Sequence, residues 1–142
     1  MQRIHRACVI DDDEIFLYWT TKVMQELNFC DELLVYRNGE EAINALAASV
    51  EKGGKLPEIL LLDLNMPVLD GWNFLKKFIK LTEKTGEKVR VYVVTSSVDL
   101  ADLIKAKQFP IVHNYLLKPL TIDTLMEIKG SFGVQSLKTP LN

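Results

Sequence analysis

Short apolar runs alternate with longer amphipathic segments along this chain. Five runs are typical of buried strands, and they cover 7–10, 33–36, 59–62, 89–94 and 111–117. Apolar residues recur every three or four positions in the segments that follow, which predicts helices over 13–28, 40–50, 71–81, 99–108 and 121–129. Strict alternation of strand and helix predicts an α/β fold, a three-layer α/β/α sandwich in which right-handed crossovers join five parallel strands.

The apolar faces of three helices are predicted from the same spacing. We expect the following residues to pack on the sheet: Phe16, Trp19, Val23, Met24 and Leu27 in the first helix, Trp72, Leu75, Phe78 and Ile79 in the third, and Ile122, Leu125 and Met126 in the last. Asp70 is expected to cap the third helix, and 82–87 to form a polar loop. Ile15, Leu17 and Tyr18 fall off the first stripe, so they are either ordinary exposed residues or a surface for a partner, and Ile15 and Tyr18 are the predicted partner surface.

Length and composition fit one domain. The chain has 142 residues, of which 48% are hydrophobic and 25% charged, so we expect it to bury a core and to have no room for an output domain. We expect a domain over 1–130 and a poorly ordered tail over 131–142, where glycine and proline recur. Cys8 and Cys30 lack metal-type spacing and are expected to be thiols rather than a disulfide.

The charge balance excludes several classes of partner. A net charge of −2 and a pI near 5.7 argue against direct binding of nucleic acid, because no basic stripe is present. No apolar run approaches the ~20 residues needed to cross a bilayer, and the N-terminus lacks an apolar signal segment. We therefore expect a cytoplasmic protein without membrane insertion.

Polar side chains stand where the predicted strands end. Asp11 and Asp12 follow the first strand, Asp63 the third, Thr95 the fourth and Lys118 the fifth. Parallel strands bring these ends to one edge of the sheet, which is where open α/β sheets bind ligands. Three carboxylates so close together repel one another unless protons are retained or a divalent cation is bound, and Mg²⁺ prefers oxygen ligands of this kind.

The residues at this edge suit the chemistry of a phosphoryl group. Lys118 offers a mobile positive charge, Thr95 offers a hydroxyl donor, and Asp63 could act as a nucleophile that forms an acyl phosphate. Taken singly, the acids could be helix caps and Lys118 an ordinary strand end. Their joint placement at four strand ends favours a site.

Four sequence motifs, in order, resemble the receiver domain of two-component response regulators. They are Val-Ile-Asp-Asp-Asp at 9–13, Leu-Leu-Asp-Leu-Asn-Met-Pro at 61–67 followed by Asp70-Gly71, Val-Val-Thr-Ser-Ser at 93–97, and Tyr-Leu-Leu-Lys-Pro at 115–119. The resemblance spans about 8–129 and is closest in kind to the stand-alone chemotaxis regulators. It implies a flavodoxin-like sheet with strand order 2-1-3-4-5.

The resemblance also implies a role for each motif residue. Asp63 would accept a phosphoryl group from a histidine of a sensor kinase or a histidine phosphotransfer protein. Thr95 and Lys118 would bind the phosphoryl oxygens, and Tyr115 would be a switch aromatic that moves with Thr95. Mg²⁺ would be held by Asp11, Asp12, Asp63 and the backbone carbonyl of Asn65.

By that resemblance the chain is a signalling protein rather than an enzyme, and phosphorylation would change its affinity for a downstream protein. The reporting face would comprise the fourth helix, the fifth strand and the fifth helix. The segment 107–113 lacks the glycine that is common in the family before the switch residue, and the neighbouring His113, like His5, is expected to be a surface or strand residue without a metal.

Two other functions remain open from the sequence. A Mg²⁺-dependent phosphatase can also use an aspartyl nucleophile, but Asn65 stands where the haloacid dehalogenase type has a second acid, and the nucleophile here follows the third strand rather than the first. A binding module that works without phosphorylation is the other alternative, against which the intact acids, threonine and lysine count.

Overall fold

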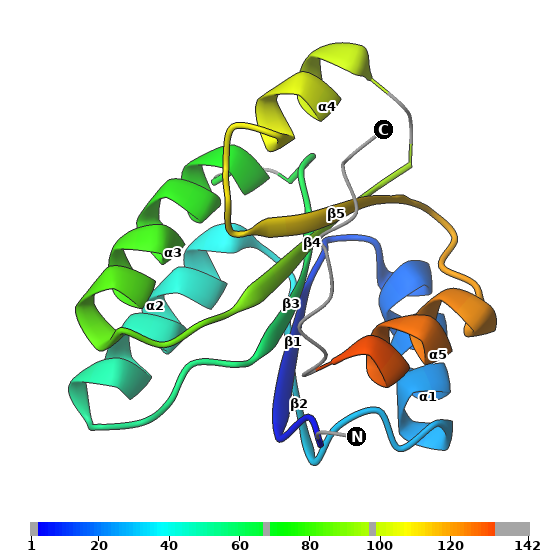
Figure 1. Ribbon diagram of the computed structural model, residues 1–142, viewed down its shortest axis with the longest axis horizontal. Helices are drawn as coiled ribbons and strands as arrows, with labels where there is room; N and C mark the ends of the chain where they lie inside the picture. Colours follow the sequence, from blue (N-terminus) through cyan, green and yellow to red (C-terminus); the bar gives the residue numbers. More distant parts are fainter. Residues whose placement is uncertain (1–2, 67–68, 97–98, 133–142) are drawn as a thin grey trace.

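The computed structural model describes residues 3–66, 69–96 and 99–132. Five strands alternate with five helices in this part of the chain, as Figure 1 shows. Their bounds are β1 (Arg6–Ile10), α1 (Glu14–Glu26), β2 (Glu32–Tyr36), α2 (Gly39–Glu51), β3 (Ile59–Asp63), α3 (Gly71–Thr85), β4 (Arg90–Thr95), α4 (Leu100–Ala106), β5 (Val112–Leu117) and α5 (Ile122–Ser131).

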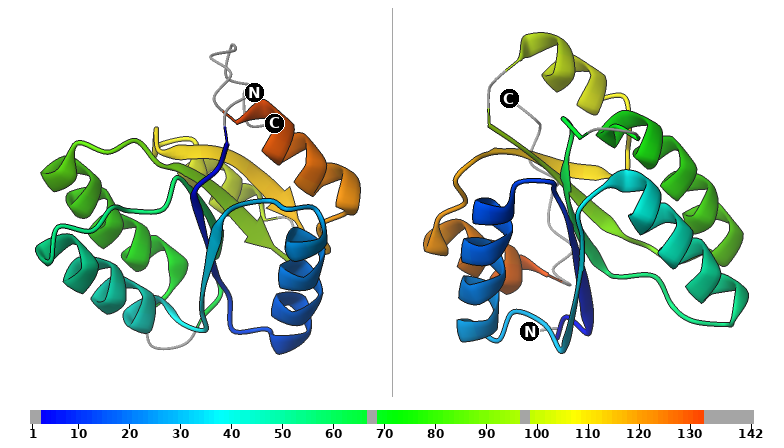
Figure 2. Two further views of the ribbon diagram at one scale, coloured as in Figure 1. Left: turned by 90° about the horizontal axis from the view of Figure 1, so that it is seen from below. Right: turned by 180° about the vertical axis from the view of Figure 1, so that it is seen from behind.

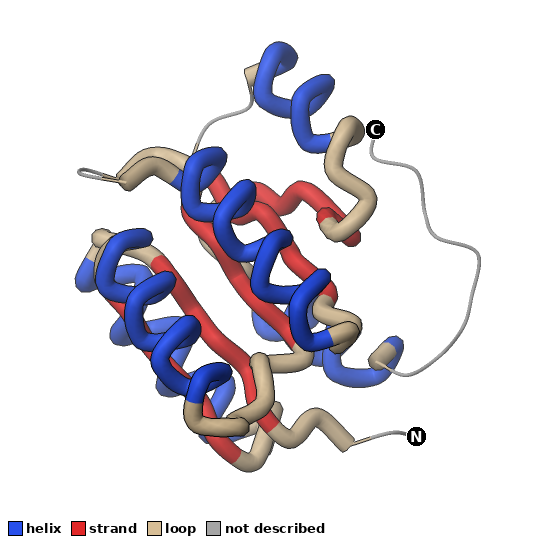
Figure 3. The backbone as a smooth tube through the Cα atoms, turned by 90° about the vertical axis from the view of Figure 1, so that its left-hand side faces the viewer, coloured by secondary structure: helices blue, strands red, loops and turns tan. Residues whose placement is uncertain are grey.

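All strand pairs are parallel, and the sheet order is β2-β1-β3-β4-β5. This confirms the predicted three-layer sandwich and its strand order. Figures 1 and 2 show α1 and α5 on one face of the sheet and α2 and α3 on the other, while α4 lies at one end of the molecule. The tube in Figure 3 shows the helices running beside the central strands.

The central strands are buried on both faces because their side chains alternate between two cores. In β3, for example, Leu60 and Leu62 pack with the α2 and α3 residues, whereas Ile59 and Leu61 pack with those of α1 and α5. Every residue of β3 is buried. A strand that is buried on both faces has consecutive apolar residues, and this run is easily recognised in the sequence.

Two predicted helix faces are wrong in part. In α1, Leu17 is buried and Trp19 is 39% exposed, although the spacing predicts the reverse. Residues 15–19 are all apolar, so periodicity alone cannot choose the face of this turn, and packing against the sheet decides it. In α5, Ile122 and Met126 are exposed, and the buried residues are Leu125 and Ile128.

Helix ends account for the other differences from prediction. α3 continues to Thr85 and ends at Gly86, whose positive φ of 73° gives the left-handed C-cap, so the predicted polar loop starts four residues too early. α5 continues to Ser131, and Phe132 is buried. The rest of the predicted tail, 133–142, lies outside the described residues.

Cys8 is a buried free thiol, and Cys30 is a partly buried free thiol, as predicted. No helix of the described ranges is long and apolar enough to cross a membrane.

Candidate functional site

The carboxyl ends of β1, β3, β4 and β5 place the predicted site residues at one edge of the sheet. Asp11 follows β1, Asp63 ends β3, Thr95 ends β4, and Lys118 follows β5. Strand register brings the ends level, because Asp63 pairs with Val94 and the Lys118 N–H donates to the Thr95 carbonyl at 2.7 Å. The topology therefore assembles the group that the sequence predicted at this edge.

Three carboxylates form the centre of the site. Asp11, Asp12 and Asp63 each offer an oxygen that lies within 4.8 Å of the other two. Asp11 and Asp63 are buried, at 1% and 5% exposed, whereas Asp12 faces solvent. A hard cation such as Mg²⁺ fits this donor set, because one or two carboxylates together with water molecules complete its coordination.

Lys118 supplies the balancing positive charge. Its Nζ lies 2.7 Å from Asp11 Oδ2 and 3.9 Å from Asp63 Oδ2, and it stands 4.6 Å from the centre of the Phe16 ring. The ammonium is therefore paired with Asp11 and can reach toward Asp63 by a small side-chain movement. The Phe16 contact, a cation–π interaction, has no sequence signal beyond the apolar periodicity of α1.

Burial makes the Asp63 carboxyl hard to ionise. It raises the pKa of Asp63 from its ordinary value of 3.8 to about 7; the charge of Asp11 adds to the rise, and Lys118 opposes it. Burial also raises the pKa of Asp11, while the hydrogen bond and charge of Lys118 and the Asp13 N–H lower it. Without a bound cation, the two buried acids compete for one lysine.

The loop after β3 is held against the phosphoacceptor candidate. The Asn65 N–H donates to Asp63 Oδ1 at 3.3 Å, and the Gly71 N–H donates to the Leu64 carbonyl at 3.0 Å. A Cβ on Gly71 would lie 2.6 Å from the Asp63 carbonyl oxygen, so only glycine allows α3 to start this close. Asp70 caps the helix by accepting from the Asn73 N–H, as predicted. Pro67, in the same loop, lies outside the described residues.

Thr95 and Tyr115 lie on adjacent strands near this edge. Thr95 is 1% exposed, and Tyr115 pairs with Val93 on β4 and packs partly buried against the α2 and α3 core. The Tyr115 hydroxyl oxygen is buried. Burial raises the pKa of Tyr115 and the charges of Asp102 and Asp99 raise it further, while hydrogen bonding to the Asp99 backbone and the Thr95 side chain lowers it.

A groove of about 910 Å³ opens beside the acid cluster, between the start of α1 and the start of α5. Its lining includes Ile15, Trp19 and Ile122, all exposed, together with Lys118. Tyr18 does not line this groove. It lines a separate pocket toward β2 with Glu14 and Arg37, so the two residues of the predicted partner surface lie on different sides of α1.

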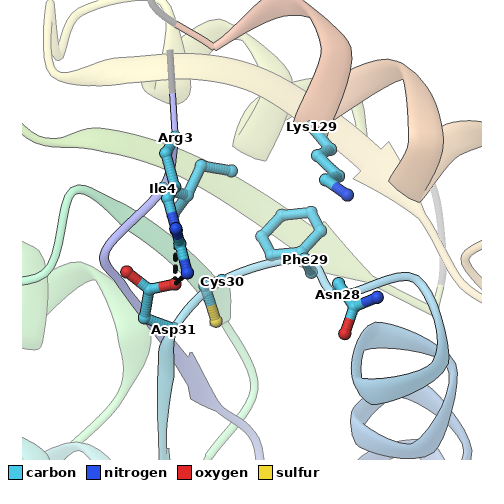
Figure 4. Close-up of a pocket in the computed structure, with 7 residues that line it drawn as sticks. All are labelled: Arg3, Ile4, Asn28, Phe29, Cys30, Asp31 and Lys129. Atoms are coloured by element: carbon cyan, nitrogen blue, oxygen red, sulfur yellow. Dashed lines mark hydrogen bonds and ion pairs between the residues drawn. The ribbon is translucent and has the colours of Figure 1, made fainter. Parts of the chain in front are cut away.

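A further hollow lies at the opposite edge of the sheet, near the amino ends of β1 and β2 (Figure 4). Its charged groups are already paired, because Arg3 binds Asp31 and Lys129 donates to the Leu27 carbonyl at 2.7 Å. His5 also contacts Asp31 and is exposed, while His113 packs edge-on against Tyr92.

Comparison with known proteins agrees with this geometry. The family model of the response regulator receiver domain matches residues 7–129, so the chain belongs to that family, whose members act in two-component signalling. The chain is 30% identical over 117 residues to the probable methanogenesis regulatory protein FilR2 of Methanothrix harundinacea, covering 82% of this chain and 74% of that protein.

Two other relatives match most of their own length. A chemotaxis protein CheY homolog of Campylobacter jejuni is 29% identical over 122 residues, which cover 86% of this chain and 87% of that protein. The crystal structure of a two-component response regulator from Cytophaga hutchinsonii superposes with a TM-score of 0.80 at 29% identity, covering 92% of this chain and 97% of that one. Other curated relatives are longer, and the chain spans 50% or 22% of their length.

Proposed function

We propose that this receiver domain accepts a phosphoryl group on Asp63 and thereby changes its affinity for a downstream protein. The observation that carries the proposal is the position of Asp63, which is buried at the end of β3 with two further acids within 4.8 Å and the Lys118 ammonium at 3.9 Å. These neighbours would not be expected around an acid with a purely structural role, because each added carboxylate makes the ionisation of Asp63 more costly.

The proposed reaction is an in-line phosphoryl transfer from a phosphohistidine. An ionised Asp63 oxygen attacks phosphorus, a P–O bond forms as the P–N bond breaks, and the donor imidazole retains the electron pair and takes up a proton. Mg²⁺ held by Asp11, Asp12, Asp63 and the Asn65 carbonyl would neutralise charge on the phosphoryl oxygens and favour the ionised form of Asp63. Lys118 would move from Asp11 toward the new phosphoryl oxygens, and Thr95 would donate its hydroxyl to one of them.

The proposed switch connects this movement with a surface on the other side of β5. Displacement of Thr95 would open space beside Tyr115, whose hydroxyl is buried and responds to the Thr95 side chain. Large apolar side chains are exposed on the proposed reporting face, namely Leu100, Ile104, Leu117, Ile122 and Met126. An exposed apolar face of this kind is suited to a downstream protein target. Hydrogen exchange of α4, β5 and α5 should change on phosphorylation, and unchanged exchange would refute this part.

The groove beside Lys118 is the proposed docking site for the phosphodonor, a sensor histidine kinase or a histidine phosphotransfer protein. The groove is apolar and opens next to the acid cluster, so a helix seated in it would present a histidine to Asp63. Ile15→Asp should slow transfer from a phosphorylated donor protein but leave labelling by a small phosphodonor unchanged. An equal fall in the rate of phosphorylation with both donors would show that the substitution disturbs the acid cluster itself rather than the docking of the donor protein.

The function is tested by incubating the protein with Mg²⁺ and acetyl phosphate and searching for an adduct by mass spectrometry. We expect one phosphoryl group that is stable in acid and labile in base, and its loss in Asp63→Asn. An adduct at full yield in that variant would refute the assignment. Sustained turnover of unrelated phosphomonoesters would favour a phosphatase instead.

A further inference from the structure

The first turn of α3 links the phosphoacceptor to α4. Gly71 packs so closely on the Asp63 carbonyl that a Cβ would lie 2.6 Å from it, and Trp72 is the next residue. Trp72 is buried, at 8% exposed, and its ring stacks on Phe109 with a centroid distance of 5.6 Å and an interplanar angle of 20°. Phe109 lies in the connection from α4 to β5.

Two side chains of α4, Asp102 and Lys105, also contact the Trp72 indole. The Trp72 Nε1–H donates to Asp102 Oδ1 at 3.4 Å, and the Lys105 ammonium lies 4.9 Å from the ring centre. Asp102 and Lys105 are three residues apart and therefore share one face of the helix. Trp72 thus donates a hydrogen bond to Asp102, forms a cation–π contact with Lys105 and stacks on Phe109.

α4 packs on the core through a small face, made by Ala106 and the partly buried Leu103. It is the shortest helix of the described chain, with seven residues, and Ala106 is its one buried residue. Leu100 and Ile104 are 69% and 53% exposed, and α4 lies at one end of the molecule (Figures 1 and 3). A short helix with so small a buried face depends on a few side-chain contacts for its position.

Asp102 connects this contact with Tyr115. Its carboxylate accepts from the Trp72 indole and also lies close enough to the Tyr115 hydroxyl for its charge to act there. A shift of α4 therefore changes the surroundings of Tyr115 and the indole together.

We propose that Trp72 is a positioning residue that clamps α4 in the arrangement in which Lys118 is paired with Asp11. The inference rests on the proposed function, since it concerns the movement that follows phosphorylation of Asp63. Occupation of the site draws Lys118 toward Asp63 and favours a shifted α4, and the clamp opposes that shift. Loosening the clamp lowers the cost of the shift and tightens binding of a phosphoryl mimic.

The test measures the affinity for beryllofluoride in the presence of Mg²⁺, for the full chain, four single variants and one double variant. Trp72→Phe keeps a ring for the stack but removes the N–H donor, and Asp102→Ala removes the acceptor. We expect each to bind beryllofluoride about 3- to 10-fold more tightly, the effect of one hydrogen bond. The double variant should gain no more than either single variant, because both break the same contact.

Two matched variants separate this role from a general packing effect. Asp102→Asn keeps an oxygen acceptor and should bind within about twofold of the parent protein. Phe78→Leu changes another buried aromatic residue of α3, one that stacks on Phe74. It should lower the free energy of unfolding while leaving the affinity within about twofold.

The indole itself gives a second readout. With Trp19→Phe as the background in every sample, Trp72 is the sole tryptophan, and its emission should change with the same midpoint as beryllofluoride binding. Unchanged or weaker affinity in Trp72→Phe, additive effects in the double variant, or emission that does not respond at saturation would each overturn the proposal. Absence of any beryllofluoride binding by the parent protein would instead refute the proposed function, and the inference with it.

Discussion

Replacing Asp63 by asparagine should stabilise the metal-free protein, although it removes the proposed phosphoacceptor. Asparagine has nearly the same shape as aspartate and can accept the Asn65 N–H in the same way, but it carries no charge. The substitution therefore removes the cost of holding a second carboxylate ion beside Asp11 in a buried site. A stabilising substitution at the reactive residue is typical of sites that are built for function rather than for stability.

The magnitude follows from the pKa of Asp63, which rises from 3.8 to about 7. The folded protein keeps this proton through a pH range in which the unfolded chain has lost it, so the carboxyl lowers stability progressively as pH rises from ~4 to ~7. At ~1.36 kcal/mol per pH unit, the full cost is up to ~4 kcal/mol above pH 7. Between about pH 5 and pH 8, the stability advantage of the asparagine variant should grow by ~2.5 kcal/mol.

Urea unfolding in EDTA at these two pH values measures the difference. Asp70→Asn is the matched control, because asparagine caps a helix as well as aspartate does, and it should change stability by less than ~0.5 kcal/mol at either pH. Adding Mg²⁺ should stabilise the parent protein more than Asp63→Asn and so shrink the advantage. An advantage that is absent, or that falls as pH rises, would refute the electrostatic account of the site.

Three further outcomes are expected. Lys118→Met should destabilise the protein by ~1–3 kcal/mol at pH 8 and by less at pH 5, because it removes the ammonium that pairs with Asp11; equal losses at both pH values in urea unfolding would contradict this. Gly71→Ala should cost ~1–3 kcal/mol and slow labelling by acetyl phosphate, because its Cβ would press on the Asp63 and Leu64 backbone, and an unchanged rate would show that α3 can move away freely. Chelation of divalent cations by EDTA should abolish that labelling, and excess Mg²⁺ should restore it; labelling that persists in EDTA would exclude a metal role.

Most of the fold could be predicted from the sequence, since strands buried on both faces leave continuous apolar runs. β3 is the best example, because all five of its residues are buried and its last one is Asp63, the proposed phosphoacceptor. The site followed from topology, because parallel strands carry their carboxyl ends to one edge wherever they lie in the sequence. Asp11 and Lys118 are 107 positions apart in the sequence, yet the Lys118 ammonium lies close to the carboxylates of both Asp11 and Asp63.

The rest depends on contacts between elements that no local pattern encodes. The buried face of α1 includes Leu17 in place of Trp19, and the Lys118 ammonium sits over Phe16, because packing and not periodicity sets the rotation of that helix. Trp72 is predicted as a core residue of α3 from its spacing. Its hydrogen bond to Asp102 depends on how α3 packs beside α4, which the spacing of residues in either helix does not predict.

The most direct test of the central claim is to locate the phosphoryl group itself. Borohydride reduces an aspartyl phosphate to homoserine, so protein treated with Mg²⁺ and acetyl phosphate, then reduced and digested, reports the modified position by mass spectrometry of the peptides. The account predicts homoserine at position 63 and at no other acid of the cluster, with none in a sample reduced without the phosphodonor. Homoserine at position 11 or 12, or unmodified Asp63 in a sample that carries the phosphoryl adduct, would contradict it.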